Sequence, residues 1–251
     1  MLERRVAETF VELADTLVAG FDVIDLLHTL AERCAELPGA DAAGIMLADQ
    51  RGTLALAAAS DQQARLMELL QLQEQQGPCL DACYSGRQTT CADLAARPSR
   101  WPDFTATAQH YFAAMHALPL RLRDQRLGAM GLFSTVPGGL ETGALSIAQA
   151  LADVAAIGIV HQQLLHQHPL ITEQLQGTLN SRVLIEQAKG VLAARHGITP
   201  DQAFGRLRTH ARSHGRRLTD LAADVLDGAV DITEPTGRPR RLRGYDESAG
   251  P

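Results

Sequence analysis

The chain has 251 residues, of which 45% are hydrophobic and 4% aromatic, and its formal net charge is −6. This length and composition indicate a globular protein of two domains and exclude a disordered or fibrous chain. Four cysteines, no recognisable signal peptide and no stretch approaching the roughly eighteen apolar residues of a membrane span predict a cytoplasmic protein without a disulfide framework or a membrane partner.

Helical and strand patterns alternate along the first two thirds of the chain. Amphipathic or apolar stretches between breaker residues predict helices at residues 1–19, 22–37, 61–74, 79–84, 104–112 and 141–168. Short apolar runs that end at turn residues predict hairpins from residues 42–49 with 52–60 and 115–123 with 126–135, and a short strand at 88–92. This order predicts an α/β (α+β) domain over residues 20–165, in which helices pack on one side of an antiparallel sheet.

Residues 166–180 predict a helical linker. Apolar residues continue at near-helical spacing through residues 145–179, but the spacing drifts and Pro169 interrupts it, so a sustained coiled coil does not follow. One hypothesis is that these helices pair across a homodimer and set the distance between two C-terminal modules. The alternative, that they simply cover the sheet, accounts equally well for the residues up to about 160.

Residues 181–232 predict a small all-α domain of three helices. The first helix gathers one apolar face from Leu184, Ile185, Ala188, Val191 and Leu192. The second begins at Thr199-Pro200, a capping residue followed by proline at the first helical position. Helices this short are unstable alone, so we expect them to pack on one another. Residues 233–251, rich in proline, glycine and arginine, predict a disordered basic tail.

The charge of this small domain differs from that of the rest. Residues 176–227 hold eight basic and five acidic residues, whereas the first 175 hold 11 arginines and 20 acids. A locally basic module on an acidic protein is typical of a nucleic-acid-binding output. The chain has 22 arginines but one lysine, Lys189, which suggests a position that needs a compact charge. On charge alone, a solvated helix face explains the pattern about equally well.

Three motifs carry a resemblance to a known family. They are Ala188-Lys189-Gly190, then Asp201-x-Ala203-Phe204-x-x-Leu207-Arg208, then Leu218-x-x-Leu221-Ala222. Over residues 181–227 the chain resembles the ANTAR domain, the three-helix RNA-binding output module of bacterial transcription antitermination regulators. The resemblance implies that a homodimer binds paired short hairpins in a nascent leader transcript, which prevents a terminator from forming.

The resemblance also implies roles for individual residues. The expected RNA-binding side chains are Arg182, Lys189, Arg208 and Arg212. Three small residues are expected to allow close approach to RNA or close packing: Ala188, Gly190 and Ala203. We add three peripheral candidates from their charge alone: Arg195, Arg206 and Arg217.

The hairpin at residues 115–135, the long helix after it and the run Gln76-Gly77-Pro78-Cys79-Leu80-Asp81-Ala82 resemble a GAF domain, here over about residues 20–165. The run is similar to one seen in GAF domains fused to ANTAR modules. The resemblance implies a sensor, used in signal transduction, that binds a small molecule or mediates dimerisation. It does not identify the ligand, so any cofactor is unknown.

Cys79, Cys83 and Cys91 are the candidate redox or ligand-binding residues. Cys79 and Cys83 are four apart, on one face of a helix, and three thiols in a cytosolic domain suit redox chemistry or a metal. The spacing forms no tight Cys-x-x-Cys pair, however, and cysteine is often a small buried apolar residue. The spacing of His161, His166 and His168 does not suit a helical zinc site.

No phosphate-binding loop, nucleophile elbow or metalloprotease motif is present, so we expect no catalytic residues, no metal and no enzyme. The leading interpretation is an RNA-binding antiterminator controlled by a GAF sensor. The alternative is a GAF-fold cysteine redox enzyme, or a redox or metal sensor, with a helical dimerisation tail. DNA binding is a third possibility, disfavoured because no helix-turn-helix pattern is evident.

Overall fold

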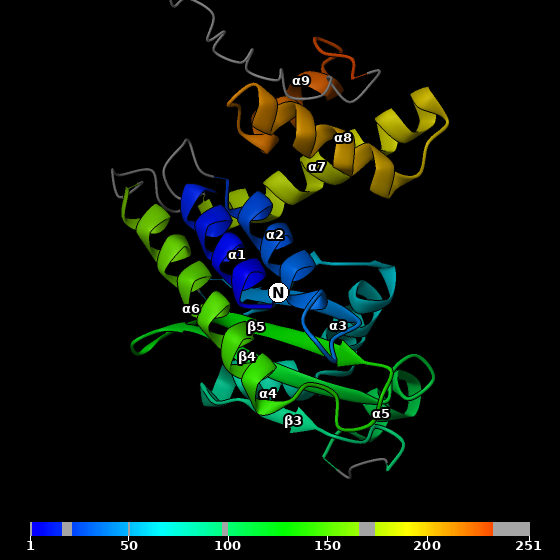
Figure 1. Ribbon diagram of the computed structural model, residues 1–251. Helices are drawn as coiled ribbons and strands as arrows, with labels where there is room; N and C mark the ends of the chain where they lie inside the picture. The colour runs from blue at the N-terminus through cyan, green and yellow to red at the C-terminus, as the bar shows by residue number, and fades with distance from the viewer. Residues whose placement is uncertain (1, 17–21, 50, 97–99, 166–173, 233–251) are drawn as a thin grey trace, which may run out of the picture.

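The computed structural model describes residues 2–16, 22–49, 51–96, 100–165 and 174–232 (Figure 1). Three predicted features lie outside these residues. They are the basic tail (233–251), most of the helical linker (166–173 of 166–180), and the histidines His166 and His168. The described elements form a domain built on one sheet, here called the sheet domain, and a C-terminal group of three helices, here called the helical bundle.

The sheet has five strands in the order β2-β1-β5-β4-β3, and all neighbours are antiparallel. The strands are β1 (Ala42–Ala48), β2 (Leu54–Ala59), β3 (Thr89–Cys91), β4 (Ala114–Leu122) and β5 (Gln125–Ser134). Both predicted hairpins are confirmed, as β1 with β2 and β4 with β5. The central strands β1, β4 and β5 are buried along almost their whole length.

Helices cover both faces of this sheet, so the prediction that they pack on one side is wrong. The helices of the sheet domain are α1 (Leu2–Thr16), α2 (Val23–Ala35), α3 (Gln62–Glu74), α4 (Pro78–Ser85), α5 (Pro102–Ala108) and α6 (Thr142–Leu165). The reason is the composition of the central strands, which are apolar at successive positions instead of alternating. A strand that is apolar on both faces needs cover on both.

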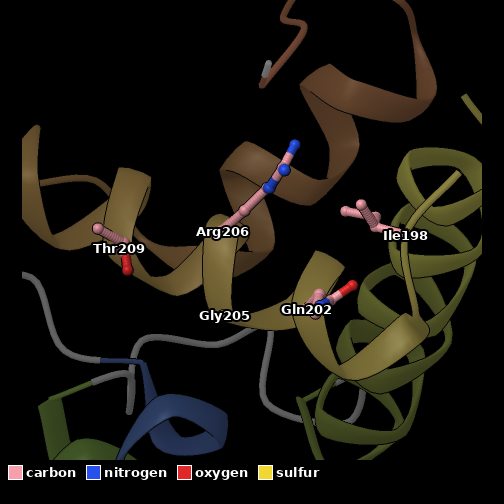
Figure 2. A pocket seen from close by; sticks show the side chains of 5 residues that line it. All are labelled: Ile198, Gln202, Gly205, Arg206 and Thr209. Carbon is pink, nitrogen blue, oxygen red and sulfur yellow. The ribbon is translucent and has the colours of Figure 1, made fainter. Parts of the chain in front are cut away.

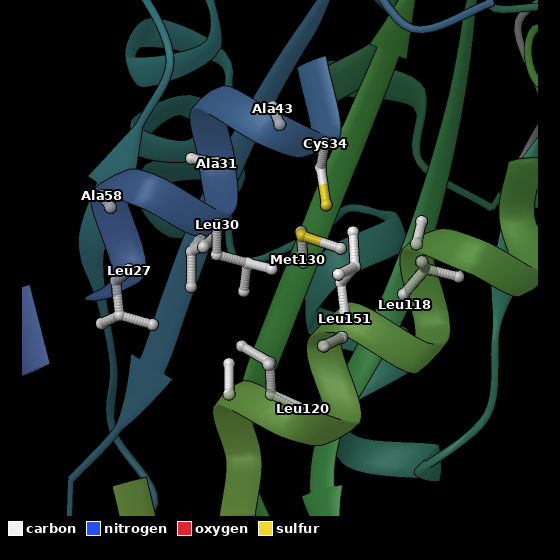
Figure 3. Close-up of a cluster of buried hydrophobic side chains, with 14 of the residues drawn as sticks. Leu27, Leu30, Ala31, Cys34, Ala43, Ala58, Leu118, Leu120, Met130 and Leu151 are labelled. Carbon is white, nitrogen blue, oxygen red and sulfur yellow. The ribbon is translucent and has the colours of Figure 1, made fainter. Parts of the chain in front are cut away.

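The first face is covered by α2 and α6, with α1 outside them (Figure 3). Leu27 and Leu30 of α2, Leu118 of β4, Met130 of β5 and Leu151 of α6 are almost completely buried there. The second face is covered by α3, α4 and α5, which enclose Met67, Phe104 and Phe133 with the cysteines discussed below. Each large side chain fully buried in these cores contributes on the order of 2 kcal/mol to folding.

Helix α6 is long and apolar enough to cross a membrane by length and composition alone, with a mean hydropathy of 1.8 over Thr142–Gln162. The expectation that no stretch approaches this limit is therefore wrong for α6, because Ser146, Gln149 and Asp153 interrupt its apolar residues without lowering their average much. Ala148, Leu151, Ala152 and Ala155 of α6 lie buried in the first core, which is the place of a core helix.

The helical bundle consists of α7 (Gln174–His196), α8 (Pro200–Ser213) and α9 (Leu218–Leu226), as predicted. Thr199 caps α8 in a complete capping box with Gln202, which satisfies two donors at the start of the helix. The three helices share a core to which α2 adds Ile24, which is only 2% exposed. The bundle therefore packs against the sheet domain at the N-terminal part of α2 (Figure 1).

Candidate nucleic-acid interface

The ring of Phe204 brings together two basic side chains of the bundle. Phe204 lies in α8, and the Lys189 ammonium from α7 is 5.3 Å from its ring centroid. The Arg208 guanidinium, one turn further along α8, is 5.7 Å from the same ring. Cations at this distance are attracted by the ring quadrupole. The fold thus brings together Lys189 and Arg208, which the sequence predicted as RNA-binding residues.

Lys189 is buried despite its charge, with only 8% of the residue exposed. Its Nζ donates to both carboxylate oxygens of Glu186, at 3.1 and 3.2 Å, and Glu186 also accepts from Arg65 of α3. Burial alone would raise the pKa of Glu186, but the Lys189 ammonium and then the Arg65 guanidinium outweigh it and lower the pKa. The single lysine is therefore held as an ion pair at the edge of the sheet domain.

Arg208 and Arg212 both point toward α2 of the sheet domain. Arg208 donates to Asp25 Oδ1 at 2.7 Å, to Glu32 Oε1 at 2.5 Å and to Thr29 Oγ1 at 2.9 Å. Arg212 donates to Asp25 Oδ2 at 3.2 Å and to Thr29 Oγ1 at 2.8 Å. The Arg208 side chain is only 12% exposed, and Arg212 is 41% exposed.

Burial alone would lower the pKa of Arg208, but its hydrogen bond with Glu32 and its ion pair with Asp25 outweigh that effect, so its pKa lies above the usual value. Arg208 stays charged in this environment. A buried guanidinium of this kind needs anionic partners, because an unpaired one would carry a large desolvation cost.

The other predicted site residues lie in different surroundings. Ala188 and Ala203 are fully buried in the bundle core, whereas Gly190 is exposed with open space around it. The side chain of Arg182 lies outside the described residues. Arg195 is exposed, and Arg217 pairs with Asp220.

Arg206 lines a shallow pocket of about 320 Å³ with Ile198, Gln202, Gly205 and Thr209. Figure 2 shows Ile198, Gln202 and Arg206 around the same hollow at the start of α8. Arg206 and Arg208 are two residues apart on one helix and therefore face nearly opposite sides.

Sequence reasoning missed the polar residues of the sheet domain that contact the helical bundle. Asp22, Asp25, Thr29 and Glu32 follow one another at steps of three and four residues, so they form one polar face of α2. The sequence shows this polar face by its spacing. No local pattern indicates that Arg208 and Arg212, more than 170 residues away, contact it.

Comparison with known protein families identifies both parts of the chain. The family model of the GAF domain matches residues 22–160, which is more than half of the chain, and that of the ANTAR domain matches residues 173–226. The chain belongs to the GAF domain family and carries an ANTAR domain. The GAF domain is the main part of the sheet domain, and the ANTAR domain is the helical bundle. No curated protein matches the chain.

Solved structures of GAF domains share the fold of the sheet domain. The GAF domain of a phosphoenolpyruvate-protein phosphotransferase from Coxiella burnetii has a TM-score of 0.53 and 15% identity, covering 64% of this chain and 96% of its own. The corresponding domain from Acinetobacter has a TM-score of 0.52 and 14% identity, covering 65% and 96%. A free methionine-R-sulfoxide reductase from Neisseria meningitidis has a TM-score of 0.48 and 18% identity, and the match covers 61% of this chain and 84% of the reductase.

Within the GAF domain, Cys79 belongs to a buried polar cluster under the sheet. Gln71 Nε2 donates to Glu68 Oε2 at 2.9 Å, the backbone N–H of Cys79 donates to Gln71 Oε1 at 2.8 Å, and the Cys79 thiol donates to Glu68 Oε1 at 3.4 Å. All three residues are fully buried. Burial raises the pKa of the Glu68 carboxyl to about 8, against smaller opposing effects of hydrogen bonds from Cys79 and Gly131. Glu68 is therefore mostly protonated at neutral pH.

The cysteines of the GAF domain are free buried thiols. Burial raises the pKa of Cys79 well above its usual value, and the neighbouring Glu68 raises it further. Burial also raises the pKa of Cys83 and of Cys91. Protonated thiols are poor nucleophiles and poor metal ligands. Among the described residues, no group of three or more His, Cys, Asp or Glu side chains is placed to hold a metal ion.

Replacing Gly131 by alanine is expected to destabilise the protein by about 1–3 kcal/mol. A Cβ at this position in β5 would overlap the Glu68 carboxyl and lie 3.0 Å from the Cys79 sulfur. The measurement is the free energy of unfolding in denaturant. Gly143→Ala is the control, because a Cβ there meets no atom within 4 Å. Equal stability of the two variants would contradict the tight packing described for Glu68.

Proposed function

We propose that this protein is a signal-responsive regulator of transcription that binds RNA as an antiterminator in the cytoplasm. The ANTAR domain binds paired hairpins in a nascent leader transcript, and the GAF domain controls it. The observation that supports this proposal most strongly is the cluster around Phe204. In an ANTAR domain on an otherwise acidic chain, it gathers the only lysine and Arg208 on one ring, with Arg212 beside Arg208.

The chemistry of the cluster suits structured RNA. Ammonium and guanidinium groups bind phosphates, and a guanidinium also forms two parallel hydrogen bonds with one phosphate or base edge. Hairpin loops expose unpaired bases, which aromatic and arginine side chains recognise by stacking and hydrogen bonding. Phe204 is itself only 8% exposed, so it supports such a contact by holding the two cations at its ring.

We further propose that the protein acts as a homodimer. Two linked ANTAR domains on two linked hairpins gain affinity by effective concentration, which offsets the weak binding of one small domain. A dimer surface is available on α1 and α6, which contact each other. Val11 on α1 is 60% exposed and Ile157 on α6 is 50% exposed, although both are apolar. A second copy would cover them.

The alternative of a cysteine redox enzyme of the GAF fold has less support. It needs an accessible thiolate, whereas Cys79 is fully buried and the pKa of its thiol is raised well above the usual value. We therefore assign no catalytic role to the cysteines. A GAF sensor joined to an ANTAR domain is the arrangement of a regulator.

The test is a mobility-shift titration of the full-length protein at fixed salt, because the electrostatic part of nucleic-acid binding depends on salt. We expect tighter binding to a two-hairpin leader RNA than to either hairpin alone, by about tenfold or more. Duplex DNA of equal length should bind more weakly than the two-hairpin RNA. Equal binding to DNA, or to the single hairpins, would contradict the proposed function.

A further inference from the structure

The contact between α2 and the ANTAR domain uses the same cations that the proposed function assigns to RNA. Asp25 accepts from both Arg208 and Arg212, and Glu32 accepts from Arg208. Thr29 accepts from both arginines and donates to the backbone carbonyl of Asp25 at 2.9 Å. Thr29 is 1% exposed and the Asp25 side chain is 15% exposed, so these groups shield Arg208, whose side chain is 12% exposed, from solvent.

Apolar and aromatic contacts extend the same interface. Ile24 lies in the bundle core with 2% of its surface exposed. The ring of His28 is 4.4 Å from the ring of Phe204, measured between centroids. Phe204 is thus covered by His28 of α2, in addition to Lys189 and Arg208. An RNA base cannot stack on a ring that His28 occupies.

One carboxylate of the GAF domain also caps a helix of the ANTAR domain. Oδ1 of Asp22 accepts from the backbone N–H of Ile24 and so caps α2. Oδ2 of the same carboxylate accepts from the backbone N–H and from the hydroxyl of Thr219, both at 3.1 Å. Arg217, at the N-cap position of α9, supplies no side-chain cap. The start of α9 is therefore capped by a residue from the other domain, a specific contact that loose packing would not produce.

We propose that the acidic face of α2, formed by Asp22, Asp25, Thr29 and Glu32, is a built-in competitor of RNA for the basic face of the ANTAR domain. Carboxylates occupy the arginine donors in the way that RNA phosphates would, so one set of donors serves either α2 or RNA. The structure is the closed state, and RNA binds after the ANTAR domain leaves α2. This inference rests on the proposed function and adds its regulation.

In competition of this kind, the apparent RNA affinity is the affinity of the open state multiplied by the fraction of molecules that are open. A signal that loosens α2 raises that fraction without touching the RNA-binding residues. Arg65 adds a second connection, since it joins α3 of the GAF domain to Glu186 beside Lys189. The GAF domain thus holds three of the ANTAR cations, Arg208 and Arg212 directly and Lys189 through Glu186.

The test is the RNA affinity of the full-length double variant Asp25→Asn/Glu32→Gln. It keeps the shape of both side chains and removes the charges that hold Arg208. We expect affinity for the two-hairpin RNA to rise by about 10- to 100-fold over the wild type, the usual range of coupling between sites. Small-angle scattering should show a larger maximum dimension, because the ANTAR domain is released. Asp124→Asn/Glu74→Gln is the control, because it removes the same charge outside this interface.

The outcomes separate this inference from the proposed function. If the wild type binds the RNA as tightly as the Asp25→Asn/Glu32→Gln variant does, or if the control variant gains as much affinity, the competition is overturned while RNA binding stands. Release of the ANTAR domain without any gain in affinity also overturns it. If neither the wild type nor the variants prefer the two-hairpin RNA to duplex DNA, the proposed function itself fails.

Discussion

Replacing Lys189 by methionine is expected to weaken binding of the full-length protein to a two-hairpin RNA by about 10- to 100-fold. Methionine fills the buried site beside Phe204 but carries no charge, so the variant loses a charge-assisted contact worth about 1.5–3 kcal/mol. The salt dependence of binding should also become shallower, because fewer counterions are released from the phosphates. The measurement is a set of titrations at several salt concentrations.

The matched control for this variant is Arg51→Met. Arg51 lies exposed in the turn between β1 and β2 and is not part of the basic face of the ANTAR domain, so the substitution changes the net charge equally without altering that face. We expect Arg51→Met to bind RNA nearly as the wild type does. If the two variants bind equally well, and both melt at the wild-type temperature, Lys189 has no part in the interface.

The stability of the protein is expected to fall as the pH rises from about 5 to about 8 because of Glu68. The pKa of this carboxyl is raised from 4.5 to about 8 by burial, so the folded state holds its proton more tightly than the unfolded state does. The stability that protonated Glu68 contributes is fully present below its pKa in the unfolded state, and it is lost as the pH rises through its pKa in the folded state. Over that interval the loss is on the order of several kcal/mol.

The measurement is the free energy of unfolding in denaturant at pH values from 5 to about 9, for the wild type and for Glu68→Gln. Glutamine is a neutral isostere of the protonated carboxyl, so the variant should lose this part of the pH dependence and exceed the wild type in stability at pH 8 and above. The difference between the two curves isolates Glu68 from other titrating groups such as His116, whose pKa burial lowers. Parallel curves would show that Glu68 is ionised in the folded protein.

Most elements of the fold could be predicted because their signals are local. The two hairpins, the length of α6 and the capped start of α8 at Thr199 are each encoded within a few residues by periodicity, turns and caps. The motifs of the ANTAR domain lie within fifty residues, so their resemblance was visible without any tertiary information.

The rest could not be predicted because it depends on contacts between distant residues. Helical cover on both faces of the sheet follows from strands that are apolar at successive positions, a pattern that a short helix also shows. The sequence marked Arg208 and Arg212 as cations but could not show that Asp25 neutralises both of them. Similarly, the burial of Cys79 against Glu68 depends on how α3 and α4 meet under the sheet.

The most direct test of the account is amide hydrogen exchange of the full-length protein with and without the two-hairpin RNA. Backbone amides exchange according to how often their helix opens or is uncovered. If RNA replaces α2 on the ANTAR domain, exchange should slow in α8 around Phe204, Arg208 and Arg212, and quicken in α9 near Thr219, which loses its cap from Asp22. Protection of α8 by RNA with no change at Thr219 would contradict the closed state, and no protection of α8 at all would contradict the RNA interface.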